Sequence, residues 1–233
     1  MPSSRLVIAI RILVVAVLLI ATPILASRVS GGFGTTLATL VAVTTYAFLA
    51  GSLLDRTRTA VGPADLVTLV RGGLACGAAG YAVLVLRGEV PTQAWLIFAV
   101  AMLAVLLDGV DGAVARATGT QSRSGARLDA ETDAALFLIL SLIAAPLVGV
   151  WVLASGLLRY AFGLGVMVKP TWRRALPPRE SRRVVAAIQG VVLASVFAPF
   201  IPVWLATTAC ALALALLVWS FGRDVVWLQR QAR

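Results

Sequence analysis

Ten acidic residues occur in this chain of 233 residues, and four of them are aspartates gathered in one short stretch. Asp108 and Asp111 are three residues apart, and Asp129 and Asp133 are four residues apart. Residues at these spacings share one face of an α-helix. Four carboxylates facing one another would repel without cations between them, and oxygen ligands favour Mg²⁺ or Mn²⁺. The pattern therefore predicts a site for two divalent ions, which suits in-line displacement at phosphorus.

Small and basic residues are interleaved with these aspartates. Gly112 follows the first pair, and its missing side chain allows a ligand to approach the helix backbone. Arg116 carries a forked guanidinium group suited to phosphate. A lone aspartate in a membrane helix could equally be a proton relay or an ion-pair partner. Four at these spacings disfavour a purely structural role, because ionisable groups are costly within a membrane.

Long apolar blocks without charge surround the aspartates. The chain is 60% hydrophobic and 13% charged, with a mean hydropathy of +0.97, whereas soluble domains carry about 25% charged residues. These blocks predict an all-α integral membrane protein, because a helix satisfies its own backbone hydrogen bonds in lipid. We expect eight helices, near residues 6–25, 35–54, 64–86, 91–118, 126–148, 151–168, 181–199 and 202–219. Both aspartate pairs then lie near one end of the fourth and fifth helices.

The net charge of +10 comes mainly from arginines between the apolar blocks. This placement favours contact with anionic lipid headgroups over binding of nucleic acid, for which no motif is present. The positive-inside rule puts both termini and the aspartate pairs on the cytoplasmic side of a multi-pass protein, which we expect in a bacterial inner (plasma) membrane. The first apolar block also fits a signal peptide, but Pro23 and Arg11 favour a retained helix.

The aspartates and their neighbours resemble the complete signature of the CDP-alcohol phosphotransferases. The matching residues are Asp108, Asp111, Gly112, Ala115, Arg116, Gly125, Asp129 and Asp133. The resemblance covers residues 63–233 as a six-helix catalytic core and leaves residues 1–62 as an additional N-terminal transmembrane hairpin. It implies that the four aspartates bind two Mg²⁺ or Mn²⁺ ions. It also implies that Asp133 accepts the proton of the attacking hydroxyl group.

The resemblance further implies a binding site for the CDP-lipid donor. Gly112 and Arg116 would contact the CDP group, and Ser122 lies where related enzymes place a small hydroxyl residue. Asp65 and Thr68 match the motif that opens the first core helix, although Ala64 replaces its usual proline. These two residues could instead be N-terminal helix caps.

The implied reaction moves a phosphatidyl-type group from a CDP-lipid, such as CDP-diacylglycerol, to a small alcohol or alcohol phosphate, with release of CMP. Arg159, Arg182 and Arg183 are candidates for binding an acceptor phosphate. They favour glycerol 3-phosphate or inositol phosphate over ethanolamine or choline. The basic run of inositol-phosphate enzymes is missing around Arg159, so the acceptor stays open. Homodimers are common among these enzymes, and we expect one here.

Other functions account for part of the pattern. Membrane prenyltransferases use aspartates and Mg²⁺ against a diphosphate, but their two motifs lie on distant helices. A divalent-cation or proton-coupled transporter would explain the carboxylates but not Gly112, Ala115 and Arg116. An inactive scaffold with this fold would not need to keep all four aspartates.

Overall fold

The computed structural model describes residues 36–44, 63–118, 123–169 and 179–231, and these residues form helices and no strand. The helices are α3 (Pro63–Leu86), α4 (Trp95–Thr118), α5 (Arg123–Val148), the short 3₁₀ helix η1 (Val150–Val152), α6 (Leu153–Val168), α7 (Glu180–Ser195) and α8 (Val203–Arg230). The predicted all-α class is confirmed for this part of the chain. The expected helix at 6–25 lies outside the described residues, and the one at 35–54 is described only at 36–44, where it is helical.

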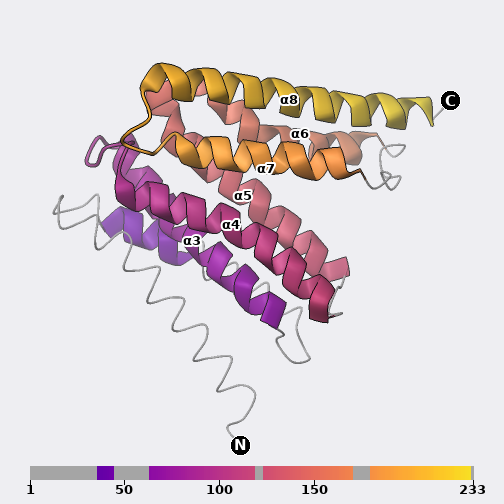
Figure 1. The fold of residues 1–233 in the computed structure, drawn as a ribbon, viewed down its shortest axis with the longest axis horizontal. Coiled ribbons are helices and arrows are strands. Elements are labelled where there is room, and N and C mark those ends of the chain that lie inside the picture. The colour runs from indigo at the N-terminus through magenta and orange to yellow at the C-terminus, as the bar shows by residue number, and fades with distance from the viewer. Residues whose placement is uncertain (1–35, 45–62, 119–122, 170–178, 232–233) are drawn as a thin grey trace, which may run out of the picture.

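Consecutive helices run in opposite directions, so their connections alternate between two ends of the molecule (Figure 1). One end holds the connections at residues 87–94, 149–152 and 196–202. The other holds the start of α3, the end of α4, the start of α5, the start of α7 and the end of α8. We call the latter the basic end, because Arg179, Arg182, Arg183, Arg223 and Arg230 belong to it. The aspartate-bearing parts of α4 and α5 lie at this same end.

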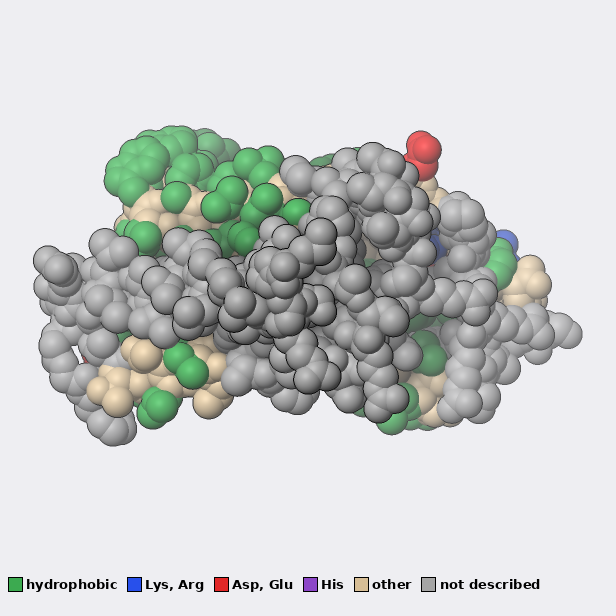
Figure 2. Space-filling view, turned by 90° about the horizontal axis from the view of Figure 1, so that it is seen from below, with side chains coloured by type: hydrophobic (Ala, Val, Ile, Leu, Met, Phe, Trp, Pro, Cys, Tyr) green, Lys and Arg blue, Asp and Glu red, His purple; other side chains and the backbone are tan. Residues whose placement is uncertain are grey.

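The described surface is largely apolar between the two ends. Two helical stretches, Val150–Val168 and Val203–Arg230, are long and apolar enough to cross a membrane, and shorter apolar stretches occur at Val70–Leu86, Trp95–Gly109 and Thr132–Val148. Only 28% of the apolar window in the second stretch is buried, unlike the core helix of a soluble protein. Figure 2 shows hydrophobic side chains exposed on one part of the molecule, while the visible charged groups gather toward the basic end.

A glycine allows a close crossing of two helices in the bundle. Gly156 of α6 lies against α5, where an added Cβ atom would come within 2.4 Å of the Cα atom of Leu138. Small residues permit such backbone contact between membrane helices, where packing rather than water exclusion drives association. The crossing therefore holds α6 against the helix that carries Asp129 and Asp133.

The side chain of Gln93 joins the connection at residues 87–94 to the connection at residues 196–202, at the end opposite the aspartates. The Gln93 amide nitrogen donates to the carbonyl oxygens of Val196, Ala198 and Ile201, at 3.3, 3.3 and 2.9 Å. The Ala94 amide donates to the Phe197 carbonyl at 3.1 Å. The fourth predicted helix was therefore placed too early. Residues 91–94 bind the neighbouring connection, and α4 begins only at Trp95.

Helix α8 ends eleven residues beyond the end that the sequence predicted. Its apolar run weakens after Trp219, yet the helix continues to Arg230. The buried positions continue with helical spacing through Leu217, Ser220, Asp224 and Leu228. Asp224 pairs with Arg179, which precedes α7, and with Arg182 in its first turn, so a charged residue can occupy an inward position of α8.

Candidate functional site

Two of the predicted aspartates come together from different helices. Asp108 lies on α4 and Asp133 on α5, and one nitrogen of Arg71 on α3 contacts both. The distance from Arg71 Nη2 to Asp108 Oδ1 is 2.9 Å, and the same nitrogen donates to Oδ1 of Asp133. Helix α3 packs against both α4 and α5, which brings the guanidinium group between the two carboxylates.

The three side chains differ sharply in exposure. Arg71 is 1% exposed, whereas the side chains of Asp108 and Asp133 are 46% and 31% exposed. The arginine therefore forms the buried floor of the cluster, and the carboxylates keep an accessible side. A buried arginine needs such partners, because removing a charge from water without compensation is costly.

The other aspartates lie close by along the same helices. Asp111 is three residues beyond Asp108 on α4, and Asp129 is four residues before Asp133 on α5. Their side chains, and those of Arg116, Asp65 and Thr68, lie outside the described ones, and Ser122 lies outside the described residues altogether. The backbone places Gly112 and Arg116 on α4, and Asp65 and Thr68 on α3. The structure thus brings Asp108 and Asp133 together and puts the other metal and nucleotide candidates, apart from Ser122, on α3, α4 and α5.

The donor chemistry of this cluster fits hard divalent cations. Carboxylate oxygens from two helices converge, and the chain contains no histidine. Cys76 and Cys210 are both buried, on α3 and α8. Oxygen donors without nitrogen or sulfur ligands are typical of Mg²⁺ and Mn²⁺ sites.

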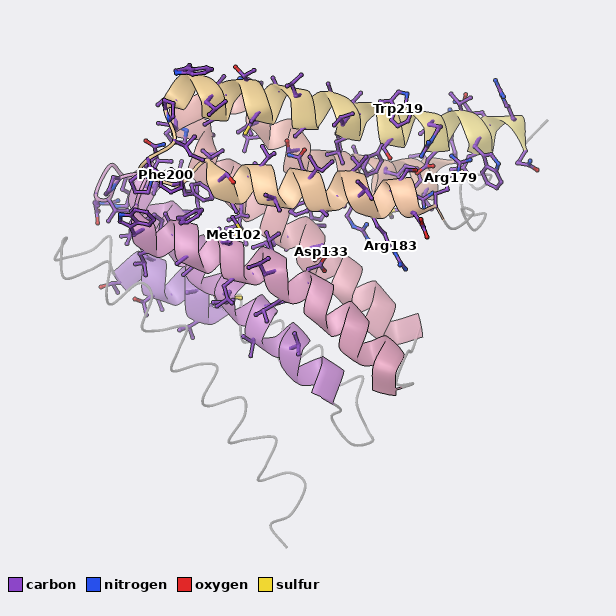
Figure 3. The ribbon with its side chains drawn as sticks, viewed as in Figure 1. Met102, Asp133, Arg179, Arg183, Phe200 and Trp219 are labelled. Carbon is purple, nitrogen blue, oxygen red and sulfur yellow. The ribbon has the colours of Figure 1, made fainter. Side chains whose placement is uncertain are left out.

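The candidate acceptor arginines have different surroundings. Arg159 on α6 and Arg183 on α7 are exposed, and no hydrogen bond or ion pair joins either to another described residue. Figure 3 shows Arg183 projecting from α7 away from α8, on the side where α4 and α5 lie. Helix α7 packs against both of these helices, so Arg183 belongs to the side of the bundle that carries the aspartates.

Arg182 is held by an acidic residue that the sequence analysis missed. Its Nε and Nη2 atoms donate to the two oxygens of Asp224 at 2.9 and 3.1 Å, and Arg179 Nη1 lies 3.6 Å from the same carboxylate. The Asp224 side chain is 6% exposed. Such a bidentate ion pair fixes the orientation of the guanidinium group. Arg182 is therefore engaged in joining α7 to α8, which leaves Arg183 as the more available of the two neighbours.

Arg71 is the second residue that sequence reasoning missed. It is the first charged residue after Asp65 in an otherwise apolar helix, and ionisable residues in such helices are functional by default. An isolated charge within an apolar helix is therefore the sequence signal that points to Arg71. Asp224 gave a weaker signal, because it lies among charged residues that read as the end of a helix.

A helical bundle with membrane-length apolar helices and two aspartates that converge at one end fits the class of membrane-associated transferases that act on phosphate groups. A family model described as CDP-alcohol phosphatidyltransferase matches residues 61–219, which is more than half of the chain, so the protein belongs to this family. Comparison with curated proteins and with solved structures gives no match.

Family membership confirms the resemblance predicted from the aspartate motif. The family consists of transferases that act on phosphate groups and build phospholipids from a CDP-alcohol donor and an alcohol acceptor. Its members are membrane-associated and generally depend on divalent metals.

Proposed function

We propose that this protein transfers a phosphatidyl-type group from a CDP-lipid, CDP-diacylglycerol in the first instance, to a small alcohol or alcohol phosphate. The acceptor oxygen forms a bond to the lipid-side phosphorus, the bond from that phosphorus to CMP breaks, and CMP leaves. The convergence of Asp108 and Asp133 from adjacent helices carries this proposal. A partly exposed pair of carboxylates at the end of two apolar helices is suited to a headgroup reaction at the membrane surface.

In this reaction Asp133 takes the proton of the attacking hydroxyl group. Its side chain is 31% exposed, so a small acceptor can reach it. Asp108, Asp111, Asp129 and Asp133 would hold two Mg²⁺ or Mn²⁺ ions, which supply positive charge opposite the diphosphate of the donor. Gly112, Arg116, Ser122, Asp65 and Thr68 are proposed to hold the CDP group.

The acceptor is proposed to carry a phosphate group. Arg183 supports this choice, because it is an exposed cation on the side of α7 that faces the aspartate helices (Figure 3). Replacing it in Arg183→Gln should raise the KM for a phosphorylated acceptor at least about tenfold, with little change in the KM for the CDP-lipid. Steady-state kinetics with glycerol 3-phosphate and inositol phosphate measure both values, and an unchanged acceptor KM would contradict the assignment.

The proposal also covers the N-terminal segment, the orientation in the membrane and the oligomeric state. Residues 1–62 form an additional N-terminal transmembrane hairpin, which the start of the family match at residue 61 supports. The basic end faces the cytoplasm of a bacterial cell, in accord with the positive-inside rule, and the chain works as a homodimer. Neither prenyl transfer nor ion transport gains support from the family match.

The decisive experiment is a CMP-release assay with purified protein, CDP-diacylglycerol and Mn²⁺ or Mg²⁺. A panel of acceptors should include glycerol 3-phosphate, inositol phosphate, inositol, ethanolamine, choline and serine. We expect CMP release to depend on one acceptor and a lipid product to appear in equal amount. The proposed transfer would be refuted if no acceptor in the panel supports CMP release. It would also be refuted if the lipid product lacks the acceptor group.

A further inference from the structure

We propose that Arg71 is a positioning residue that serves as the protein's own counter-cation beneath the aspartate site. It holds the carboxylates of Asp108 and Asp133 side by side before divalent ions bind. This inference deepens the proposed function and rests on the metal site proposed there. It assigns a role to a residue on α3, outside the aspartate motif itself.

The geometry of the pair supports this role. A single nitrogen, Arg71 Nη2, contacts Oδ1 of both carboxylates, and the two acidic residues come from different helices. Without a shared cation these carboxylates would repel one another and push α4 and α5 apart. One guanidinium group therefore acts as a bound cation would, because its positive charge reduces the repulsion between the two carboxylates.

The different exposure of Arg71 and of the two aspartates means that the arginine and a divalent ion would contact the carboxylates from different sides. Arg71 is 1% exposed and lies below, while Asp108 and Asp133 keep 46% and 31% exposure above it. The carboxylates can therefore present their accessible side to divalent ions while their Oδ1 atoms stay in contact with the arginine. Arginine suits this position better than lysine, because its charge persists at any relevant pH and its nitrogens are fixed in a plane.

A structural role and a counter-cation role predict different effects of metal. If Arg71 only fills space or fixes α3, its loss lowers stability equally with and without divalent ions. If it neutralises the carboxylates, its loss costs most when no ion is bound, because bound ions then replace its charge. The informative quantity is therefore the difference between the melting temperature with divalent ions and the melting temperature without them, compared between the variant and the wild type.

The test compares full-length wild type, Arg71→Gln and Arg71→Lys in detergent by thermal unfolding, in EDTA and in Mn²⁺. For Arg71→Gln we expect the midpoint in EDTA to fall by about 10 °C and the Mn²⁺-induced rise to exceed that of wild type by about 5 °C. Arg71→Lys keeps the positive charge, so its unfolding midpoint in EDTA and its Mn²⁺-induced rise should lie between those of wild type and Arg71→Gln. It also keeps the proposal testable if Arg71→Gln does not fold.

Arg182→Gln is the matched control, since it removes an arginine from a buried aspartate on other helices. Its midpoint should fall by the same amount in EDTA and in Mn²⁺. Equal losses in both conditions for the Arg71 variants would overturn the counter-cation role and leave the metal site intact. A wild-type protein that Mn²⁺ does not stabilise would instead refute the proposed metal site, and the role of Arg71 with it.

Discussion

Asp133 combines two properties that a proton acceptor needs at a membrane surface. It is held in place by a buried arginine, and its side chain remains partly exposed. Arg71 also lies against Asp108, so one contact network orients side chains from α3, α4 and α5. The position of the proposed base is therefore determined by the packing of three helices and not by α5 alone.

Replacing this base without changing its size should stop the reaction. We expect Asp133→Asn to lower the rate of CMP release by at least about a hundredfold, because an amide cannot take the hydroxyl proton. The measurement is the initial rate with saturating CDP-lipid and acceptor. Glu180→Gln, at an exposed position of α7, is the control and should keep the wild-type rate. Normal turnover in Asp133→Asn would remove this residue from the mechanism.

Removal of divalent ions should have an equally clear effect. We expect EDTA to abolish CMP release, and Mg²⁺ or Mn²⁺ to restore it, because the aspartates are oxygen donors suited to these ions. Zn²⁺ should restore less, since the site offers neither cysteine nor histidine. Activity that persists after exhaustive chelation would contradict a metal-dependent site.

Aspartates at spacings of three and four residues on two neighbouring helices led to the expectation that the pairs face one another. Asp108 and Asp133, one residue from each pair, do come together across α4 and α5, and the shared faces of the two pairs stay a prediction. Their buried partner Arg71 was not predicted, because the position that faces them depends on how α3 is rotated against α4 and α5. Rotation about a helix axis is fixed by packing, which spacing along one chain does not reveal.

At the scale of the helices, close packing of α5 and α6 depends on one glycine. Gly156 lies against the backbone of Leu138, so even a methyl group would force the helices apart. Gly163 is on the same helix, and nothing lies within 4 Å of the position where its Cβ would be. The two glycines thus form a natural pair for comparison.

We expect Gly156→Ala to destabilise the protein by about 1–3 kcal/mol, through overpacking at the crossing. Gly163→Ala should leave stability unchanged or raise it by about 0.5–1 kcal/mol, because alanine favours the helix. Reversible unfolding in mixed micelles measures both effects. Equal stability of the two variants would show that the α5–α6 contact relaxes freely.

The positions of most helices followed from the apolar blocks, but the start of α4 and the ends of α7 and α8 each differ by four or more residues. The first and the last of these differences have distant partners. Residues 91–94 looked like a first helical turn with proline, yet Ala94 and Gln93 bind the connection around Phe197. The end of α8 looked like a polar tail, yet Asp224 turns inward to Arg182. Both errors come from partners about a hundred and about forty residues away, which local composition does not encode.

At the scale of the whole molecule, the alternating connections give the bundle two chemically different ends. Arg87 and Glu89 pair with one another at one end, and the arginines of α7 and α8 lie at the other (Figure 1). Excess basic residues remain on the cytoplasmic side during insertion. The proposed orientation therefore puts the candidate site and the proposed acceptor arginine on the cytoplasmic side.

Cysteine labelling can test this orientation, because Cys76 and Cys210 are buried and should react slowly. We expect Arg87→Cys to react with a membrane-impermeant maleimide on intact cells, since Arg87 is exposed at the end opposite the site. Glu180→Cys, exposed at the start of α7, should react only after the membrane is permeabilised. The reverse pattern would place the aspartates outside the cytoplasm.

The three hydrogen bonds of Gln93 have a mechanical consequence. They fasten the start of α4 to the link between α7 and α8, at the end farthest from the aspartates. In Figure 1, α3 to α5 diverge from α7 and α8 toward the opposite end. A hinge motion of these two groups of helices about Gln93 would therefore have its largest amplitude at the end that carries the aspartates.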